Sequence, residues 1–502
     1  MTELLRVTDA ICRLGRHKVL RIDELVIEKG QHWCFFGPNG AGKSVLASLL
    51  ASKRIESGKY VRYSEGFQAS RDIHSVSFEE QQKLWQRDNR LDVSEYSADA
   101  KDSGTLVGEL IQSSRPIKHA DAALFEQLIT ELELTALIDR GIRFLSSGQI
   151  RKALIARALY GFQPGVAQLL ILDDPLESID LDSQDRIRTC IDKFLHLGFS
   201  SIQLCRRAAD ILPGVNHIAL LDDLNLIKKG KRESIVNSEA FARIENKRPE
   251  LPDQIPHTNL PNETSQSDDK TPLIQLNSVN AAYGEQAVLE NFSWTMNSNQ
   301  HVLIECPNGC GKSTLLSLID GDNHKAYGQD VTLFGRKKGS GETVWEVKAK
   351  FGVVSNELHN KYAKGWKVLD VVVSGFFDSV GLYDDSGTQE TEVARKWLEA
   401  LKITDLAQHF YHEISFGQQR LVLLARAMVK QPRILILDEP CVGLDEYHCA
   451  LILGVLDKIA EQTTTNIIYV SHVANEKLRC INNRLSFRRT ATGGFQVTET
   501  AG

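Results

Sequence analysis

The feature that most constrains the fold of this 502-residue chain is a set of short motifs that occurs twice, in the same order. Lys43 and Lys312 each close a glycine-rich segment, and Gly148 and Gly417 each lie in a serine-x-glycine-glutamine segment. The members of each pair are 269 positions apart, and each glycine follows its lysine by 105 positions. Because this period is too long for a solenoid repeat, the sequence predicts two copies of one domain.

The first glycine-rich segment, Gly37–Ser44, reads GPNGAGKS and fits the phosphate-loop pattern GxxxxGKS. It lies between a strand-like run, Val26–Phe36, and a helical stretch, Val45–Ala51. Small residues let successive backbone N–H groups turn toward an anion, the lysine adds charge, and the helix N-terminus adds its dipole. The predicted nucleotide-binding residues here are Gly37, Pro38, Asn39, Gly40, Ala41, Gly42, Lys43 and Ser44.

The second glycine-rich segment, Glu305–Thr314, reads ECPNGCGKST and has Cys306 where the pattern has its first glycine. Either the backbone φ of Cys306 is negative and cysteine is tolerated, or the loop holds local strain of about 1–3 kcal/mol. The hydroxyl that follows each lysine, from Ser44 or Ser313, can ligate Mg²⁺. The predicted nucleotide-binding residues of this loop are Pro307, Asn308, Gly309, Cys310, Gly311, Lys312, Ser313 and Thr314.

The two serine-x-glycine-glutamine segments have two interpretations. Either one alone predicts a helix capping box, with serine at the N-cap and glutamine three residues later. Their recurrence at a fixed distance from the phosphate loops favours a nucleotide-contacting role instead. The residues concerned are Ser146, Ser147, Gly148, Gln149, Ser415, Phe416, Gly417 and Gln418.

Paired carboxylates follow two apolar runs of strand length, in Leu169–Pro175 and Ile434–Pro440. Such runs suit parallel strands buried on both faces, and open α/β sheets bind ligands at the carboxyl ends of their strands. Asp173 and Asp438, the first carboxylate of each pair, are the candidate metal ligands. Each half adds one more short strand, ending at Arg206 or His472, 33 and 34 positions after those aspartates. We therefore expect Arg206 and His472 to be structural equivalents, with a solvated arginine pair, Arg206-Arg207, as the alternative in the first half.

Bulk properties exclude several classes of protein. A formal net charge of −6 argues against a dominant nucleic-acid surface, so no direct nucleic-acid partner is expected. No apolar run approaches the length of a membrane span, and the N-terminus lacks a signal peptide's apolar core. The nine cysteines include no CxxC pair. We expect a cytoplasmic protein, any membrane contact of which would be peripheral. We also expect domains at 1–245 and 272–502 and a proline-rich linker at 246–271.

In this order and twice over, the motifs resemble those of the ABC-type ATPases, across nearly all of the chain except the linker. The resemblance implies two P-loop cassettes, each an α/β RecA-like core with an antiparallel β subdomain and a helical subdomain. Within the family, Leu333–Thr343 and Phe351–Ser355 are similar to tandem members associated with molybdate transport genes. The resemblance also implies ATP and Mg²⁺ as ligands, and a monomer whose cassettes pair head to tail.

In this family ATP lies between the phosphate loop of one cassette and the serine-x-glycine-glutamine signature of the other. For the second loop, completed by Ser146–Gln149, the resemblance implies that Glu439 orients and deprotonates the attacking water and that His472 reads the γ-phosphate. Asp438 would hold Mg²⁺, mostly through water, and Tyr283 would stack on adenine. All the chemistry-bearing side chains expected are present at this site.

The first loop, completed by Ser415–Gln418, departs from the family pattern. Asp174 stands where the catalytic glutamate is expected, which withdraws the carboxylate by about 1.5 Å. Arg206 replaces the histidine and has donors but no acceptor, so it can grip phosphate without accepting a hydrogen bond. Leu14 stands where Tyr283 aligns. We expect this site to bind ATP and to turn it over slowly.

The family's glutamine that senses the membrane subunit is also absent. Phe78 and Asn356 stand at that position in the two halves. Gln81 and Gln82 lie close and are either substitutes or solvated residues of a polar helix. This departure weakens the case for coupling to a transporter.

Three functions are open at this stage. One is an ATPase subunit that serves an integral-membrane transporter, molybdate being the cargo that the resemblance implies, with docking over residues 79–144 and 357–413. Another is a soluble tandem ATPase that remodels a cytosolic complex. A third is a nucleotide-gated scaffold, against which Glu439 and His472 argue.

Overall fold

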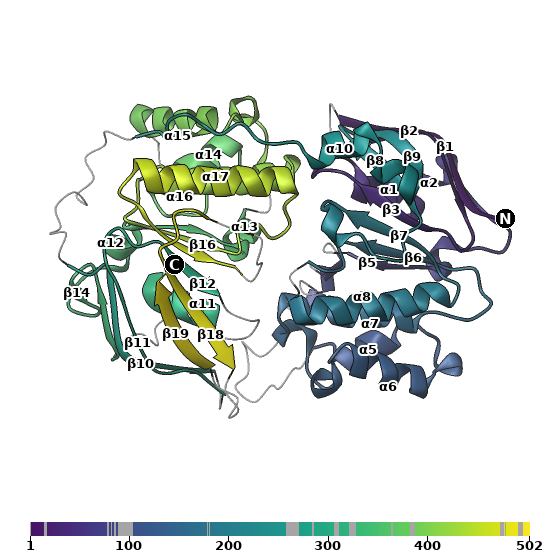
Figure 1. Cartoon of the computed structure of the whole chain (residues 1–502), viewed down its shortest axis with the longest axis horizontal. Helices are drawn as coiled ribbons and strands as arrows, with labels where there is room; N and C mark the ends of the chain where they lie inside the picture. The colour runs from purple at the N-terminus through teal and green to yellow at the C-terminus, as the bar shows by residue number, and fades with distance from the viewer. Residues whose placement is uncertain are drawn as a thin grey trace. The chain divides into compact units, whose positions relative to one another are not determined.

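The computed structural model describes residues 2–14, 18–77, 80–81, 83–84, 87–88, 104–177, 179, 181–257, 271–283, 286–305, 311–320, 328–362, 365–381, 387–471, 476, 478–489 and 495–501. The chain divides into two compact units, Met1–Lys247 and Arg248–Gly502 (Figure 1). Residues 258–270 of the predicted linker fall outside the described residues, so the predicted domain bounds stay a prediction.

The first unit is built around one large mixed sheet. Among its described residues the strand order is β4-β1-β2-β9-β8-β3-β7-β6-β5. The strands are β1 (Glu3–Leu14), β2 (Lys18–Glu28), β3 (His32–Phe36), β4 (Val61–Tyr63), β5 (Ile73–Val76), β6 (Leu169–Asp173), β7 (Ser200–Cys205), β8 (His217–Asp222) and β9 (Asn225–Lys231). The helices are α1 (Lys43–Leu50), α2 (Ser57–Tyr60), α3 (Ala69–Asp72), α5 (Val107–Gln112), α6 (Ala122–Glu131), α7 (Ser147–Tyr160), α8 (Leu181–His196), α9 (Arg232–Val236) and α10 (Glu239–Glu245).

In the second unit the strands are divided between two sheets. Its described strands form an antiparallel sheet, β11-β10-β13-β14, and a mixed sheet, β15-β16-β17-β12-β18-β19. The strands are β10 (Ile274–Tyr283), β11 (Gln286–Met296), β12 (Val302–Glu305), β13 (Asp330–Leu333), β14 (Arg336–Lys337), β15 (Phe351–Val354), β16 (Ile434–Asp438), β17 (Asn466–Val470), β18 (Asn483–Arg489) and β19 (Phe495–Ala501). The helices are α11 (Lys312–Asp320), α12 (Val344–Lys348), α13 (Asn356–Lys361), α14 (Val368–Val373), α15 (Thr388–Ala400), α16 (Phe416–Met428) and α17 (Glu446–Gln462).

Short 3-10 helices connect these elements. They are η1 (Ile117–His119), η2 (Thr135–Leu137), η3 (Ile142–Phe144), η4 (Ala208–Asp210), η7 (Ser374–Phe376), η8 (Thr404–Leu406) and η9 (Tyr411–Glu413).

The central strands explain the continuous apolar runs of the sequence. Leu170 and Leu172 of β6 face the core shared with the helices, whereas Leu169 and Ile171 face the core under β1 and β2. Strand β16 divides its residues between two cores in the same way. A parallel strand covered on both faces must be apolar at every position, and β6 pairs in parallel with both β5 and β7.

Each unit has a helical part packed beside its parallel strands. In the first unit α5 and α6 pack on α7, and in the second α14 and α15 pack on α16 (Figure 1). The predicted α/β core with an antiparallel β part and a helical part is therefore confirmed in both units. Among the helices the structure describes, none combines the length and the apolar character needed to cross a membrane.

Candidate nucleotide-binding sites

The first phosphate loop connects β3 to α1 and is held closely against the ends of β7 and β8. The Gly37 N–H donates to the Cys205 carbonyl at 3.2 Å. A Cβ on Gly37 would lie 2.1 Å from the Leu221 carbonyl oxygen, so only glycine fits there. Gly42, with φ 97°, is the N-cap of α1. The helix therefore points its unpaired N–H groups into the loop, which is the arrangement that binds phosphate.

Side chains of this loop gather at the end of β6. The Lys43 Nζ donates to the carbonyls of Gly37 and Pro38, at 2.7 and 2.9 Å, and Lys43 is 7% exposed. The Ser44 Oγ lies 3.4 Å from the Asp173 Oδ2. A hydroxyl and a carboxylate side by side, next to a lysine, form the oxygen-rich donor set that Mg²⁺ prefers.

Asp174 and Glu439 occupy equivalent places in the two units. Each follows the last residue of its strand and has a left-handed φ, 43° and 50° respectively. Each backbone N–H donates to the neighbouring parallel strand, Asp174 to Leu204 at 3.2 Å and Glu439 to Val470 at 3.0 Å. Non-glycine residues in this conformation cost about 1–3 kcal/mol and cluster at functional sites.

In the first unit a cluster of largely buried charges surrounds Asp174, with side chains of Arg206, Asp174 and Glu177 that are 12%, 14% and 17% exposed. The Arg206 Nη2 lies 3.2 Å from the Asp174 Oδ2 and 2.9 Å from the Glu177 Oε2. Arg151, two residues after the signature glutamine, donates to the Asp173 carbonyl at 3.2 Å and lies 3.7 Å from Glu177. The arginine at the switch position is thus shared between two carboxylates.

The protonation of this cluster follows from its burial. Burial raises the pKa of Asp174 to about 7, although Arg206 opposes the rise. Burial also raises the pKa of Asp173. For Glu177 burial acts in the same sense, but Arg206 and Arg151 outweigh it and hold the pKa of Glu177 below its ordinary value. Glu177 therefore carries the negative charge that fixes Arg206.

In the second unit the corresponding carboxylate, that of Glu439, has a different partner. Lys312 of the phosphate loop forms an ion pair with Glu439. Asp438 ends β16 beside it, and Gly311 has φ 94°, like its counterpart Gly42. Glu439 is thus held by the same lysine that a bound phosphate would attract.

Part of the predicted site of the second unit lies outside the residues that the structure describes. Pro307, Asn308, Gly309, Cys310 and His472 lie outside the described residues, as does Cys306. Tyr283 ends β10 and Ser313 lies in α11, but their side chains are outside the described part.

Both signature segments form helix capping boxes. The Ser146 Oγ accepts from the Gln149 N–H at 3.3 Å, and the Gln149 Oε1 accepts from the Ser146 N–H at 3.0 Å. Ser415 and Gln418 do the same at 3.3 and 2.9 Å. A Cβ on Gly417 would lie 2.4 Å from the His448 ring. The capping interpretation is therefore correct at the level of local structure, and it leaves the nucleotide-contacting role as a prediction.

Asn356, which stands at the transporter-sensing position of the second unit, is hydrogen-bonded to another residue of the same unit. Arg420, fully buried at the second position after the signature glutamine, donates to the Asn356 side chain and to the Ser355 carbonyl. In the first unit Gln81 is 8% exposed, and Phe78 and Gln82 lie outside the described residues.

Sequence reasoning missed three residues of these clusters, Glu177, Arg151 and Arg420. Glu177 could have been identified by comparing the two copies of the repeat. Glu177 lies four residues after Asp173, and the equivalent position of the second copy, four residues after Asp438, is the apolar Val442. A charge in one copy that replaces an apolar residue in the other indicates a partner, here Arg206.

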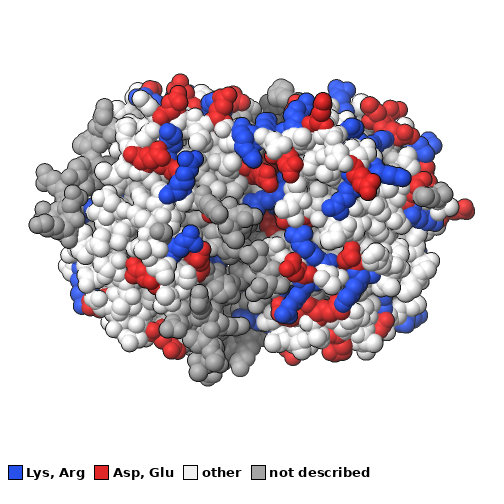
Figure 2. All heavy atoms as spheres, viewed as in Figure 1, with Lys and Arg blue, Asp and Glu red and all other residues white. Residues whose placement is uncertain are grey.

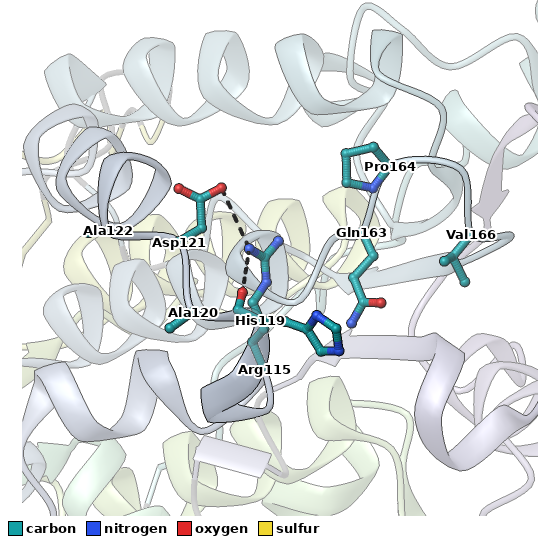
Figure 3. Close-up of a pocket in the computed structure, with 8 residues that line it drawn as sticks. All are labelled: Arg115, His119, Ala120, Asp121, Ala122, Gln163, Pro164 and Val166. Carbon is teal, nitrogen blue, oxygen red and sulfur yellow. Dashed lines mark hydrogen bonds and ion pairs between the residues drawn. The ribbon is translucent and has the colours of Figure 1, made fainter.

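A separate pocket in the first unit has none of the predicted site residues. It holds about 500 Å³ beside α6 (Figure 3). Its basic side chain, Arg115, donates to the His119 carbonyl at 3.2 Å and lies 3.6 Å from Asp121. On the face drawn in Figure 2, basic and acidic side chains are interspersed.

Comparison with known proteins gives three consistent findings. A sequence model described as ABC transporter matches residues 20–177 and 289–442. The chain is 36% identical over 490 residues to the ABC transporter ATP-binding protein ModF of Escherichia coli (strain K12), covering 96% of each chain. It is 26% identical over 360 residues to an uncharacterized ABC transporter ATP-binding protein of Schizosaccharomyces pombe, covering 70% of each.

Solved structures share the fold of the whole chain. The structure titled RNase-L Inhibitor has a TM-score of 0.57 at 16% identity, over 97% of this chain and 89% of that one. A model of ribosome-bound archaeal Pelota and ABCE1 has a TM-score of 0.62 at 16% identity, over 98% and 78%.

Proposed function

The chain belongs to the ABC transporter family, as an ABC-type ATPase with two cassettes, and from this premise we propose that its two ATP sites hydrolyse unequally. The second cassette's phosphate loop, with Glu439, carries most of the turnover. The first cassette's loop binds ATP and hydrolyses it slowly. The observation behind this proposal is the difference in partners, since Asp174 is paired with Arg206 and Glu439 with Lys312.

In the second cassette Glu439 is the general base for the attacking water. Lys312 is expected to move to the β- and γ-phosphates when ATP arrives, because their charge exceeds that of one carboxylate. Glu439 is then released to orient and deprotonate water, a role typically worth about 10²–10⁴-fold. His472, at the switch position, is proposed to read the γ-phosphate.

In the first cassette Arg206 keeps Asp174 from that role. Its guanidinium has no acceptor and cannot replace the histidine, and its ion pair restrains an already shorter side chain. Phosphate binding by the other N–H groups of Arg206 stays a prediction.

Mg²⁺ is the metal proposed for both sites. Ser44 and Asp173 would hold it in the first cassette, and Ser313 and Asp438 in the second. When bound, the ion neutralises charge on the phosphate oxygens. The contact between Ser44 and Asp173 supports this assignment.

Each site is proposed to be completed by the other cassette's signature, Ser146–Gln149 for the second loop and Ser415–Gln418 for the first. This pairing comes from the family resemblance. Helices α7 and α16 begin within the two signatures, and the first-turn N–H groups that their capping boxes do not use are those that a γ-phosphate would require.

The proposed biological setting is transport, with the chain as the ATP-binding component of a membrane transporter and molybdate as cargo. The relative named ABC transporter ATP-binding protein ModF supports the transport link, and molybdate rests on the sequence resemblance alone. One observation favours the other setting, a soluble ATPase that remodels a cytosolic complex. The Asn356 side chain is engaged by Arg420 and is not free to sense a membrane subunit.

Partner capture distinguishes the two settings. Glu439→Gln protein would be purified from its host membrane and soluble fractions with ATP and Mg²⁺, which should trap the ATP-bound state, and again without ATP. A permease enriched only with ATP supports the transport setting. Ribosomal or other cytosolic complexes enriched instead would contradict it.

A further inference from the structure

Two thiols and a carboxylate from three separate segments of the second unit converge on one point. Cys441 lies in the loop after β16, Cys449 lies in α17, and Glu476 follows β17. One ligand atom from each lies within 4.8 Å of the others. Cys441 is fully buried and Glu476 is 9% exposed. None of the nucleotide-binding motifs uses these side chains.

The carboxylate of Glu476 is held in place by two hydroxyl groups. The Tyr469 hydroxyl donates to its Oε2 at 2.7 Å, and the Ser471 hydroxyl donates to the same oxygen at 2.6 Å. Tyr469 also lies 3.6 Å from the Cys441 Sγ. Oriented carboxylates of this kind are typical of metal ligands, whose outer-shell donors fix their direction.

The described hydrogen-bond partners of Glu476 are both neutral hydroxyl groups. Within the described residues no lysine or arginine forms an ion pair with it. Burying a carboxylate without a cation is costly. A cation bound beside Glu476 would stabilise its charged carboxylate.

The donor set selects the kind of cation. Thiolates favour thiophilic ions such as Zn²⁺, whereas Mg²⁺ and Ca²⁺ take oxygen ligands. Tetrahedral Zn²⁺ with Zn–S bonds of about 2.3 Å places its sulfurs about 3.8 Å apart. The ligand atoms here would need to draw together by about 1 Å at most.

We propose that Cys441, Cys449 and Glu476 form a binding site for one thiophilic divalent cation, represented by Zn²⁺, with water as the fourth ligand. Binding replaces the two thiol protons, so two protons leave for each ion bound. The ion would link Cys441, in the loop that follows Glu439, to Cys449 of α17 and to Glu476.

The test uses the full-length, reduced, nucleotide-free protein. Zn²⁺ would be titrated against a chromophoric chelator, and Co²⁺ would be added separately as a spectroscopic probe. We expect one equivalent of Zn²⁺ per chain and thiolate-to-Co²⁺ charge-transfer bands. Cys441→Ser or Cys449→Ser should weaken binding by tenfold or more, and Cys480→Ser, which removes a thiol of the same unit outside the cluster, should leave it unchanged.

Tyr469→Phe separates a metal site from a structural cluster. It keeps the ring and removes one donor to Glu476, so Zn²⁺ affinity should fall by about 10–100-fold while the melting curve stays close to that of the parent. Failure of the reduced parent to bind one equivalent, or a Co²⁺ spectrum without thiolate bands, would overturn the proposal. Binding that survives the Cys441→Ser, Cys449→Ser double variant would also overturn it.

Discussion

Arg206 forms a largely buried ion pair with Asp174, with 3.2 Å between Nη2 and Oδ2. In the second cassette the equivalent carboxylate, Glu439, pairs instead with Lys312 of the phosphate loop. The two cassettes therefore differ in what must move before the carboxylate can act on water. In the proposed mechanism the phosphates of ATP draw Lys312 away from Glu439, whereas Arg206 is also held by its ion pair with Glu177.

Removing Arg206 should destabilise the first cassette. Arg206→Ala leaves Asp174 and Glu177 largely buried without their main cation. Breaking a fully buried pair costs about 3–5 kcal/mol, and we expect the lower end of this range because the two carboxylates are 14% and 17% exposed. The measurement is chemical denaturation of the full chain, read at the transition of the first cassette. Arg186→Ala is the matched control, because Arg186 pairs with Glu133 at an exposed site and should change stability by about 1 kcal/mol or less. Equal effects of the two substitutions would contradict the buried-pair account.

Asp174 should make stability depend on pH. Its pKa is about 7 in the folded chain and near its ordinary 3.8 when unfolded, so the folded state binds the extra proton between these values. Stability from this group is full below about pH 4 and is lost as pH rises to about 7. Relative to Asp174→Asn, the parent should therefore lose stability across this window and stay level above it. A stability difference that is constant with pH, or that grows in favour of the parent, would exclude the raised pKa.

Gly37 should tolerate no side chain. Gly37→Cys places a Cβ 2.1 Å from the Leu221 carbonyl, so we expect a loss of about 1–3 kcal/mol from overpacking and weakened ATP-analogue binding at the first loop. Gly58→Cys, where a Cβ meets nothing within 4 Å, is the control. If Gly37→Cys matches Gly58→Cys in both stability and binding, the close approach of β8 is not what requires the glycine.

If the first cassette's site hydrolyses slowly for the proposed reasons, copying three residues of the second cassette should speed it. In a Glu439→Gln background, the triple change Asp174→Glu, Glu177→Val, Arg206→His removes the ion-pair cluster and restores a longer carboxylate and a histidine. We expect ATP turnover to rise at least tenfold over Glu439→Gln alone. Unchanged turnover, with the protein folded and binding ATP, would show that another feature of the first cassette limits hydrolysis.

The fold was largely predictable from local patterns. The apolar runs that became β6 and β16, the phosphate loop before α1, and the capping boxes of α7 and α16 depend on neighbours in sequence, and repetition reinforced each of them. The side-chain contacts within the candidate sites were harder to predict from the sequence. That Arg206 turns to Glu177, and Arg420 to Asn356, depends on which side chains are buried together, and residue spacing does not report burial.

In the proposed division of labour Glu439 carries the hydrolysis and Asp174 does not. Steady-state ATPase rates of the parent, Glu439→Gln and Asp174→Asn, with ATP and Mg²⁺ saturating, test it directly. The account predicts that Glu439→Gln loses about 10²–10⁴-fold in kcat and that Asp174→Asn keeps most of the parent rate. Equal losses in the two variants would contradict it.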